Sequence, residues 1–214
     1  TAVVGTVSGT SISFGSPVVF ESGATGNISA VFDSSNGKVV IAYKDDANAD
    51  YGTAIVGTVS GTSISFGSAV VFESADSWYM STAYDSTNQK VVIAYGDAGN
   101  SYYATAVVFA TTGFSITQLG SPTVYNTGSS PNGSATYDSA NQKVVIAYTD
   151  NGGSGEGTAV VGTVSGTSIS FGTPVQFESG ASSYISATFD STNDKVVIAY
   201  TDGGNSDRGT AVVG

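Results

Sequence analysis

The sequence predicts an all-β fold built from tandem repeats, and three observations lead to this prediction. The phrase T-A-[VI]-V recurs every 52 or 53 residues, at Thr1, Thr53, Thr105, Thr158 and Thr210. A second phrase, KVVIAY, begins at Lys38, Lys90, Lys143 and Lys195. No segment has the 3.6-residue period of a helix, and the 28 glycines are spread along the chain.

Each repeat is expected to supply four strands, and the first complete copy places them at 28–33, 38–43, 53–60 and 63–72. The second strand is an unbroken apolar run, which suits a strand buried on both faces. A two-residue hairpin at Gly61-Thr62 joins the third strand to the fourth. Gly67 predicts a bulge or kink within the fourth strand.

The fourth strand is predicted at the edge of its sheet. Pro17, Pro122 and Pro174 share one position in it, and proline has no N–H for the ladder. Proline at such an edge also discourages pairing with foreign strands.

A period of 52 residues suits one four-stranded propeller blade. The predicted fold is therefore a β-propeller of four-stranded antiparallel blades, four-bladed, with the two termini sharing one blade. The chain is expected to be one repeat domain, 1–214, with repeats at 1–52, 53–104, 105–157 and 158–209 and a partial repeat at 210–214.

The termini leave an alternative open, because residues 1–5 and 210–214 both read TAVVG and compete for one strand position. One copy is displaced, or it pairs with another chain, or the chain is cut from a longer array. Two chains could also close a larger ring together. Self-association through 1–5 or 210–214 is thus one expectation.

The repeat, with KVVIAY followed by TAVVGTVSGTSISFG, resembles the highly repetitive β-propeller segments of marine microbial and viral proteins. The resemblance covers essentially the whole chain. It implies a secreted or virion-surface binding role and supplies no catalytic residues.

Composition excludes several kinds of function. The chain has no Cys and no His, so disulfides, thiolate or imidazole metal ligands and Ser-His-Asp or Cys-His nucleophile pairs are ruled out. A formal net charge of -11 argues against nucleic acid and anionic membranes as partners. No apolar run is long enough to insert into a membrane. The missing initial Met suggests a mature form or a fragment.

Departures from the repeat mark the candidate ligand site. With the four strands of a blade lettered A to D in chain order, the second blade departs from the repeat with Trp78 and Tyr79 in its expected D–A loop and with Tyr102 and Tyr103 in its B–C loop. Both loops belong to one propeller face, so the four aromatics are expected to lie together and to stack on a sugar. Asp97 and Asn100 would be their polar partners. The alternative is that these rings cover a blade edge or a contact between chains.

Four aspartates recur two residues after the strand tyrosine, at Asp45, Asp97, Asp150 and Asp202. Carboxylate oxygens on turns suit calcium, although the spacing matches no EF-hand. The alternative is that these side chains cap their own turns. No cofactor is therefore expected, unless calcium binds at these four residues.

The sequence predicts a non-catalytic binding module, extracellular or on a virion surface, that recognises a glycan or a surface receptor. The second hypothesis is a structural scaffold that exchanges strands between chains. A glycoside hydrolase is the weaker reading, because no unique carboxylate pair stands out and Arg208 is the only arginine.

Overall fold

The computed structural model describes residues 1–130 and 132–214, and the fold is all-β with 67% of the chain in strands. Every strand pair is antiparallel. The strands form a two-stranded, a nine-stranded and a seven-stranded sheet. Two single 3-10 turns, η1 (Ala98–Asn100) and η2 (Gly203–Asn205), complete the described elements.

The first complete repeat, called unit 1, forms the four predicted strands. They are β3 (Thr25–Asp33), β4 (Lys38–Asp45), β5 (Tyr51–Ser60) and a fourth strand made of β6 (Ser63–Phe66) and the first half of β7 (Val70–Asp85). Ser60 pairs with Ser63, which confirms the two-residue hairpin, and Gly61 supplies its positive φ of 60°.

Strand β7 differs from the expectation in one respect, because no loop separates the fourth strand of unit 1 from the first strand of unit 2. Its residues up to Asp76 pair with β5, and from Ser77 onward they pair with β8 (Lys90–Asp97). A single strand therefore changes its partner half-way, and it connects two units without leaving the ladder.

The remaining units repeat this plan. Unit 2 continues with β9 (Tyr103–Thr112), β10 (Ser115–Gln118) and β11 (Thr123–Ser129). Unit 3 comprises β12 (Ser134–Asp138), β13 (Lys143–Asp150), β14 (Glu156–Ser165), β15 (Ser168–Phe171) and the first half of β16 (Val175–Asp190). Unit 4 has the second half of β16, β17 (Lys195–Asp202) and β18 (Arg208–Val213). The N-terminal hairpin, β1 (Gly5–Ser8) and β2 (Ser11–Phe14), precedes unit 1.

The core lies between successive units. Strand β8 is buried over its whole length after Lys90, as its unbroken apolar run predicts. One cluster joins Val40 and Val56 of unit 1 to Ile93 and Val107 of unit 2. A second cluster joins unit 2 to unit 3 in the same way. Because each unit buries its faces against its neighbours, the array is stabilised by its interfaces rather than by isolated sheets.

The first strands of successive units contact each other through one repeated serine. The Thr82 N–H donates to Ser29 Oγ at 3.1 Å, and the Ala135 N–H donates to Ser81 Oγ at 2.8 Å. In the last pair of units, Ala187 N donates to Ser134 Oγ at 3.0 Å. The same packing relation therefore links all four units.

Glycine marks the closest approach between units. The kink predicted at Gly67 is present, since the ladder is interrupted between β6 and β7. A Cβ at Gly67 would lie 1.9 Å from the carbonyl oxygen of Phe114 in the next unit. Gly15 and Gly120 meet Thr62 and Thr167 in the same way. Only glycine fits this position, because the backbone of the next unit occupies the space that a side chain would need.

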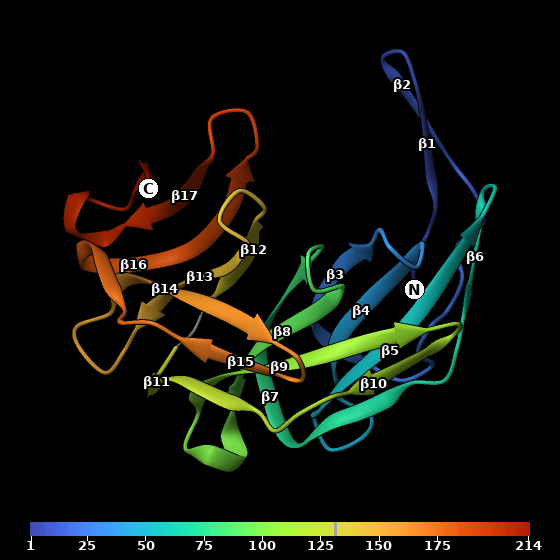
Figure 1. The fold of residues 1–214 in the computed structure, drawn as a ribbon, viewed down its shortest axis with the longest axis horizontal. Helices are drawn as coiled ribbons and strands as arrows, with labels where there is room; N and C mark the ends of the chain where they lie inside the picture. The colour runs from blue at the N-terminus through green and yellow to red at the C-terminus, as the bar shows by residue number, and fades with distance from the viewer. Residues whose placement is uncertain (131) are drawn as a thin grey trace.

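The units form an open arc (Figure 1), in which the N-terminal hairpin and the C-terminal strands stand at opposite ends. Within residues 1–130 and 132–214 no barrel or ring is closed. Strand β18 pairs with β17, whereas β1 and β2 form a sheet of their own. The expectation that the termini share one blade is therefore not met in this structure, because each TAVVG copy has found a separate partner, Val18 for Ala2 and β17 for Thr210–Val213.

Candidate functional site

The structure brings three of the four predicted aromatics into one pocket. The pocket has a volume of about 360 Å³, and its lining comprises Trp78, Tyr79, Tyr102, Ser129 and Asn151. The rings of Trp78 and Tyr79 lie 6.0 Å apart between centroids and are tilted by 39°. An apolar aromatic wall thus faces a hydroxyl and an amide, without a charged group in the lining.

Trp78 and Tyr79 occupy a bulge in β7 rather than the loop that was expected. The register with β8 shifts between Trp78 and Ser81, and Tyr79 has a φ of 55°. The equivalent residues Asn27, Asn132 and Tyr184 also have positive φ. The strained backbone therefore belongs to the repeat, and the adjacent pair of aromatic side chains is particular to this unit, since Ser183 precedes Tyr184 in unit 4.

Tyr102 lies in the turn between β8 and β9, as predicted, and half of its side chain is exposed. Its φ of 61° is shared by Asp50 and Asp207, which stand at the same repeat position. The repeated turn thus projects whichever side chain occupies this position, and in unit 2 that side chain reaches the pocket.

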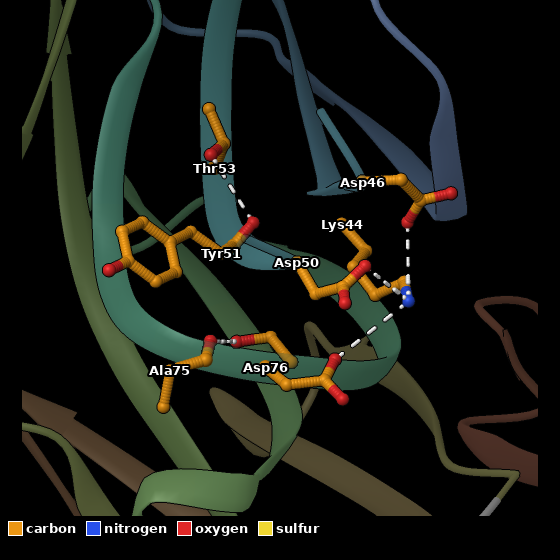
Figure 2. Close-up of polar contacts among 8 residues, drawn as sticks. Lys44, Asp46, Asp50, Tyr51, Thr53, Ala75 and Asp76 are labelled. Atoms are coloured by element: carbon orange, nitrogen blue, oxygen red, sulfur yellow. Dashed lines mark hydrogen bonds and ion pairs between the residues drawn. The ribbon is translucent and has the colours of Figure 1, made fainter. Parts of the chain in front are cut away.

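Lys44 of unit 1, a partly buried lysine, contacts Trp78 of unit 2. The Lys44 ammonium lies 4.5 Å from the centroid of the Trp78 ring. Figure 2 shows the same ammonium among three carboxylates, at 3.2 Å from Asp46, 2.8 Å from Asp50 and 3.8 Å from Asp76. The hydrogen bond to Asp50, with Asp46 nearby, raises the pKa of Lys44. Lys44 therefore stays charged and positions the indole.

The other predicted ligand residues do not line the pocket. Asp97 is buried at the end of β8, where its Oδ1 accepts a 3.2 Å hydrogen bond from the Asn100 N–H and caps η1. Tyr103 pairs with Asp97 at the start of β9. Ser129 and Asn151 supply the polar groups of the pocket instead. The sequence did not predict them, because they come from the end of β11 and the turn after β13, which are distant along the chain from Trp78 and Tyr102.

The four predicted metal residues stay apart, one in each unit. Among residues 1–130 and 132–214, no group of three or more His, Cys, Asp or Glu side chains suits a metal ion. Asp97 caps a turn, and Asp150 Oδ1 accepts from the Gly152 N–H at 2.9 Å, as the capping alternative predicts. Asp45 and Asp202 each keep one buried oxygen without a partner. Calcium at these residues stays a prediction.

A repeated glutamate was missed by the sequence analysis. Glu21, Glu73 and Glu178 accept hydrogen bonds from the hydroxyls of Tyr43, Tyr95 and Tyr200, at 3.4, 3.2 and 3.0 Å. The signal was the constant spacing of 22 residues between the two partners. In the remaining copy Asn126 replaces the glutamate, and the hydroxyl of Tyr148 is buried without a partner.

The pKa values of these carboxylates shift in different directions, because burial and neighbouring charge raise them and hydrogen bonds lower them. Burial, and then the charge of Asp97, raises the pKa of Glu73. Burial, and then the charge of Glu21, likewise raises the pKa of Asp45. The pKa of Glu178 is lowered instead, chiefly by the hydrogen bond from the Gly180 backbone. The same repeat position therefore has different electrostatics at the middle and at the end of the array.

Comparison with known proteins adds no family. No protein-family model matches the chain, and no curated protein matches it. In the described part of the chain no helix has the length and apolarity needed to cross a membrane.

Proposed function

We propose that the protein is a non-catalytic binding module that recognises a glycan in the pocket formed by Trp78, Tyr79 and Tyr102. The observation that carries this proposal is the convergence of three aromatic rings from β7 and the β8–β9 turn, a combination that no other unit has in its sequence. The apolar faces of a sugar ring stack on such aromatics. Ser129 and Asn151 supply a hydroxyl and an amide for sugar hydroxyls.

The bracing of Trp78 supports a binding role further. A ligand site is stronger when its side chains are held in place before the ligand arrives, because less conformational entropy is lost on binding. Lys44 holds the indole through a cation–π contact while its charge is neutralised by three carboxylates of unit 1. This arrangement leaves Tyr79 and Tyr102 as the exposed rings of the site.

We propose that the four-stranded units are blades of a β-propeller, with a β1–β2 hairpin completing the fourth blade. The supporting observations are the repeated serine contacts between first strands and the edge position of the fourth strand in units 1, 2 and 3. An extracellular or virion-surface location fits a glycan ligand.

A hydrolase role for the acidic residues is not proposed. The pKa of Glu73 is raised, first by burial and then by the charge of Asp97, but both oxygens of Glu73 already accept hydrogen bonds within the fold. One of its oxygens accepts from the Ala75 N–H at 3.1 Å and the other from the Tyr95 hydroxyl at 3.2 Å.

Glycan-array screening followed by titration tests the binding proposal. Trp78 is the only tryptophan, so its fluorescence reports directly on the pocket. We expect Tyr102→Ala and Tyr79→Ala each to weaken binding at least about tenfold, which is the loss of one stacking contact. Tyr184→Ala is the matched control, because Tyr184 stands at the Tyr79 position of unit 4, outside the pocket. Absence of any glycan ligand, or equal loss in the control, would overturn the proposal.

A further inference from the structure

The N-terminal hairpin exposes three apolar side chains, and the isoleucine among them is buried in every internal copy. Val7, Ile12 and Phe14 are 70%, 55% and 63% exposed. The residues that stand at the position of Ile12 in units 1, 2 and 3 are only 6%, 3% and 3% exposed, namely Ile64, Ile116 and Ile169. The hairpin therefore carries the apolar face of a complete unit without the neighbour that covers it.

The other end of the arc has a pocket of about 300 Å³ between units 3 and 4. Its apolar lining comes from β13, β14 and β17, and the chain end lies at its rim. The lining includes Val145, Ala159, Val161, Val196, Ile198 and Gly214. Val161 is 45% exposed, whereas Val108, at the same repeat position in unit 2, is 2% exposed.

The internal interface between units 2 and 3 shows what fills this space. The residues at the same positions as the pocket lining belong there to one core cluster, and they are Val92, Ala106, Val108, Val144 and Ile146. Val164, Ile169 and Phe171 of the unit 3 hairpin complete that cluster. Their repeat equivalents are Val7, Ile12 and Phe14 of the N-terminal hairpin.

Two contacts that backbone carbonyls make between units 2 and 3 also have equivalents between unit 3 and the N-terminal hairpin. Gly120 packs against the carbonyl of Thr167 in the next hairpin, but a Cβ at the equivalent Gly172 would meet only the Val161 oxygen, at 3.8 Å. Thr10 is the hairpin residue that would fill this position. Asn88 Nδ2 donates to the Val164 carbonyl at 3.5 Å, and the equivalent pair is Asn141 and Val7.

We propose that the β1–β2 hairpin of a second copy of this chain docks into the pocket between units 3 and 4, so that copies assemble head to tail. The sequence 210–214 of one copy then replaces the identical 1–5 of the other beside Val18. Since both segments read TAVVG, residues 210–214 of one copy can make the contacts that residues 1–5 of the other copy make beside Val18. The inference is independent of the glycan proposal.

A second copy fits better than the hairpin of the same chain. The hairpin and the pocket belong to opposite ends of the open arc (Figure 1). The angle between units is held by buried clusters and by glycine–carbonyl contacts that leave no room for a Cβ. Closing the arc within one chain would distort these interfaces, whereas docking a second copy displaces only the segment 1–5.

Sedimentation velocity of the 214-residue chain over a wide concentration range tests this assembly. We expect concentration-dependent association in the native sequence. Ile12→Asp removes one buried apolar contact and brings a charge into the interface, so association should shift to at least about tenfold higher concentration. Gly172→Ala should have the same effect, because its methyl has space in one chain but would meet the Thr10 carbonyl of the second copy.

Val71→Asp is the matched control, because Val71 is 44% exposed within a complete unit and should leave association unchanged. Thermal melting must show that Ile12→Asp and Gly172→Ala remain folded. Variants that associate like the native chain would overturn the proposal. A strict monomer would overturn it as well, and protection of the β1–β2 amides from hydrogen exchange in that monomer would identify closure within one chain.

Discussion

The Tyr95 hydroxyl donates a 3.2 Å hydrogen bond to the Glu73 carboxylate, which ties the buried end of β8 to the bend of β7. The contact joins β8 to the half of β7 that pairs with β5 of the preceding unit, since Glu73 lies in that half. It recurs in units 1 and 4. In unit 3 the hydroxyl of Tyr148 remains, but its carboxylate is absent.

This difference predicts opposite results for two identical substitutions. Tyr95→Phe removes a hydrogen bond to a charged acceptor and should lower the free energy of unfolding by about 1–2 kcal/mol. Tyr148→Phe removes a buried hydroxyl without a partner, so stability should stay constant or rise slightly. Urea unfolding of both variants measures the difference. Equal destabilisation would show that the Glu73 contact contributes nothing.

The pKa shifts predict a pH dependence with opposite signs at two glutamates. The pKa of Glu73 is raised above 4.5, so its ionised form costs stability at neutral pH, and the cost disappears as the pH falls below the unfolded value. Glu73→Gln should therefore raise the melting temperature at pH 7 and have little effect near pH 4. The glutamine carbonyl can keep the hydrogen bond from the Ala75 N–H, and the glutamine NH2 can donate to the Tyr95 hydroxyl, which is able to accept.

Glu178 is the matched control for this prediction. Its pKa is lowered, so its stabilisation is present above the unfolded value and is lost as the pH falls through the folded value. Glu178→Gln should lower the melting temperature at pH 7. Two variants that shift in the same direction would contradict the assignment.

Asp33 should be the most sensitive of the turn aspartates. It is buried, it accepts from the Ser35 N–H at 3.0 Å and from Asn36 Nδ2 at 2.9 Å, and it also accepts from the Thr111 hydroxyl of unit 2. Although burial opposes ionisation, these hydrogen bonds keep the pKa of Asp33 below its ordinary value. Asp33→Ala should cost roughly 3 kcal/mol or more, since several donors lose a charged acceptor.

Asp190→Ala is the comparison for Asp33, measured by the same thermal unfolding. Asp190 accepts from Thr192 and Asn193 in the same kind of turn. It is more exposed and has no hydrogen bond to another unit among the described residues. A smaller loss of stability is expected, and an equal loss would argue against the contact with Thr111 as the cause.

Lys44→Met should loosen Trp78 without touching the pocket lining. The substitution keeps an unbranched side chain but removes the cation, and it leaves the three carboxylates facing one another. We expect stronger acrylamide quenching of Trp78 fluorescence. Lys38→Met is the control, because Lys38 lies over Phe114 at 4.9 Å and contacts another part of unit 2. Unchanged quenching would show that Lys44 does not position the indole.

Calcium makes a separate prediction, tested by thermal melting with and without a chelator. A calcium ion at Asp45 or at Asp202, each of which keeps one unpartnered oxygen in its own unit, would raise the melting temperature as calcium increases, because it binds only the native state. Asp45→Asn should reduce that rise, and Asp150→Asn should not, since Asp150 already caps its turn. A melting temperature independent of calcium leaves capping as the role of these residues.

The sequence by itself determined the strands, the hairpin turns and the edge position of the fourth strand. These features follow from local chemistry that is repeated every 52 or 53 residues, such as the apolar run of β8 and the glycine of the Gly61-Thr62 turn. The grouping of Trp78, Tyr79 and Tyr102 was also predictable, because the repeat puts their segments at one rim.

Only the tertiary structure decided how the units join. The continuous β7, the partners Ser129 and Asn151, the brace from Lys44 and the bond between Glu73 and Tyr95 all connect segments from different repeats or from strands distant in the chain. Local patterns do not encode the angle between neighbouring units. That angle comes from how closely glycine lets one backbone approach the next, as at Gly67 and Phe114, and it determines which side chains meet.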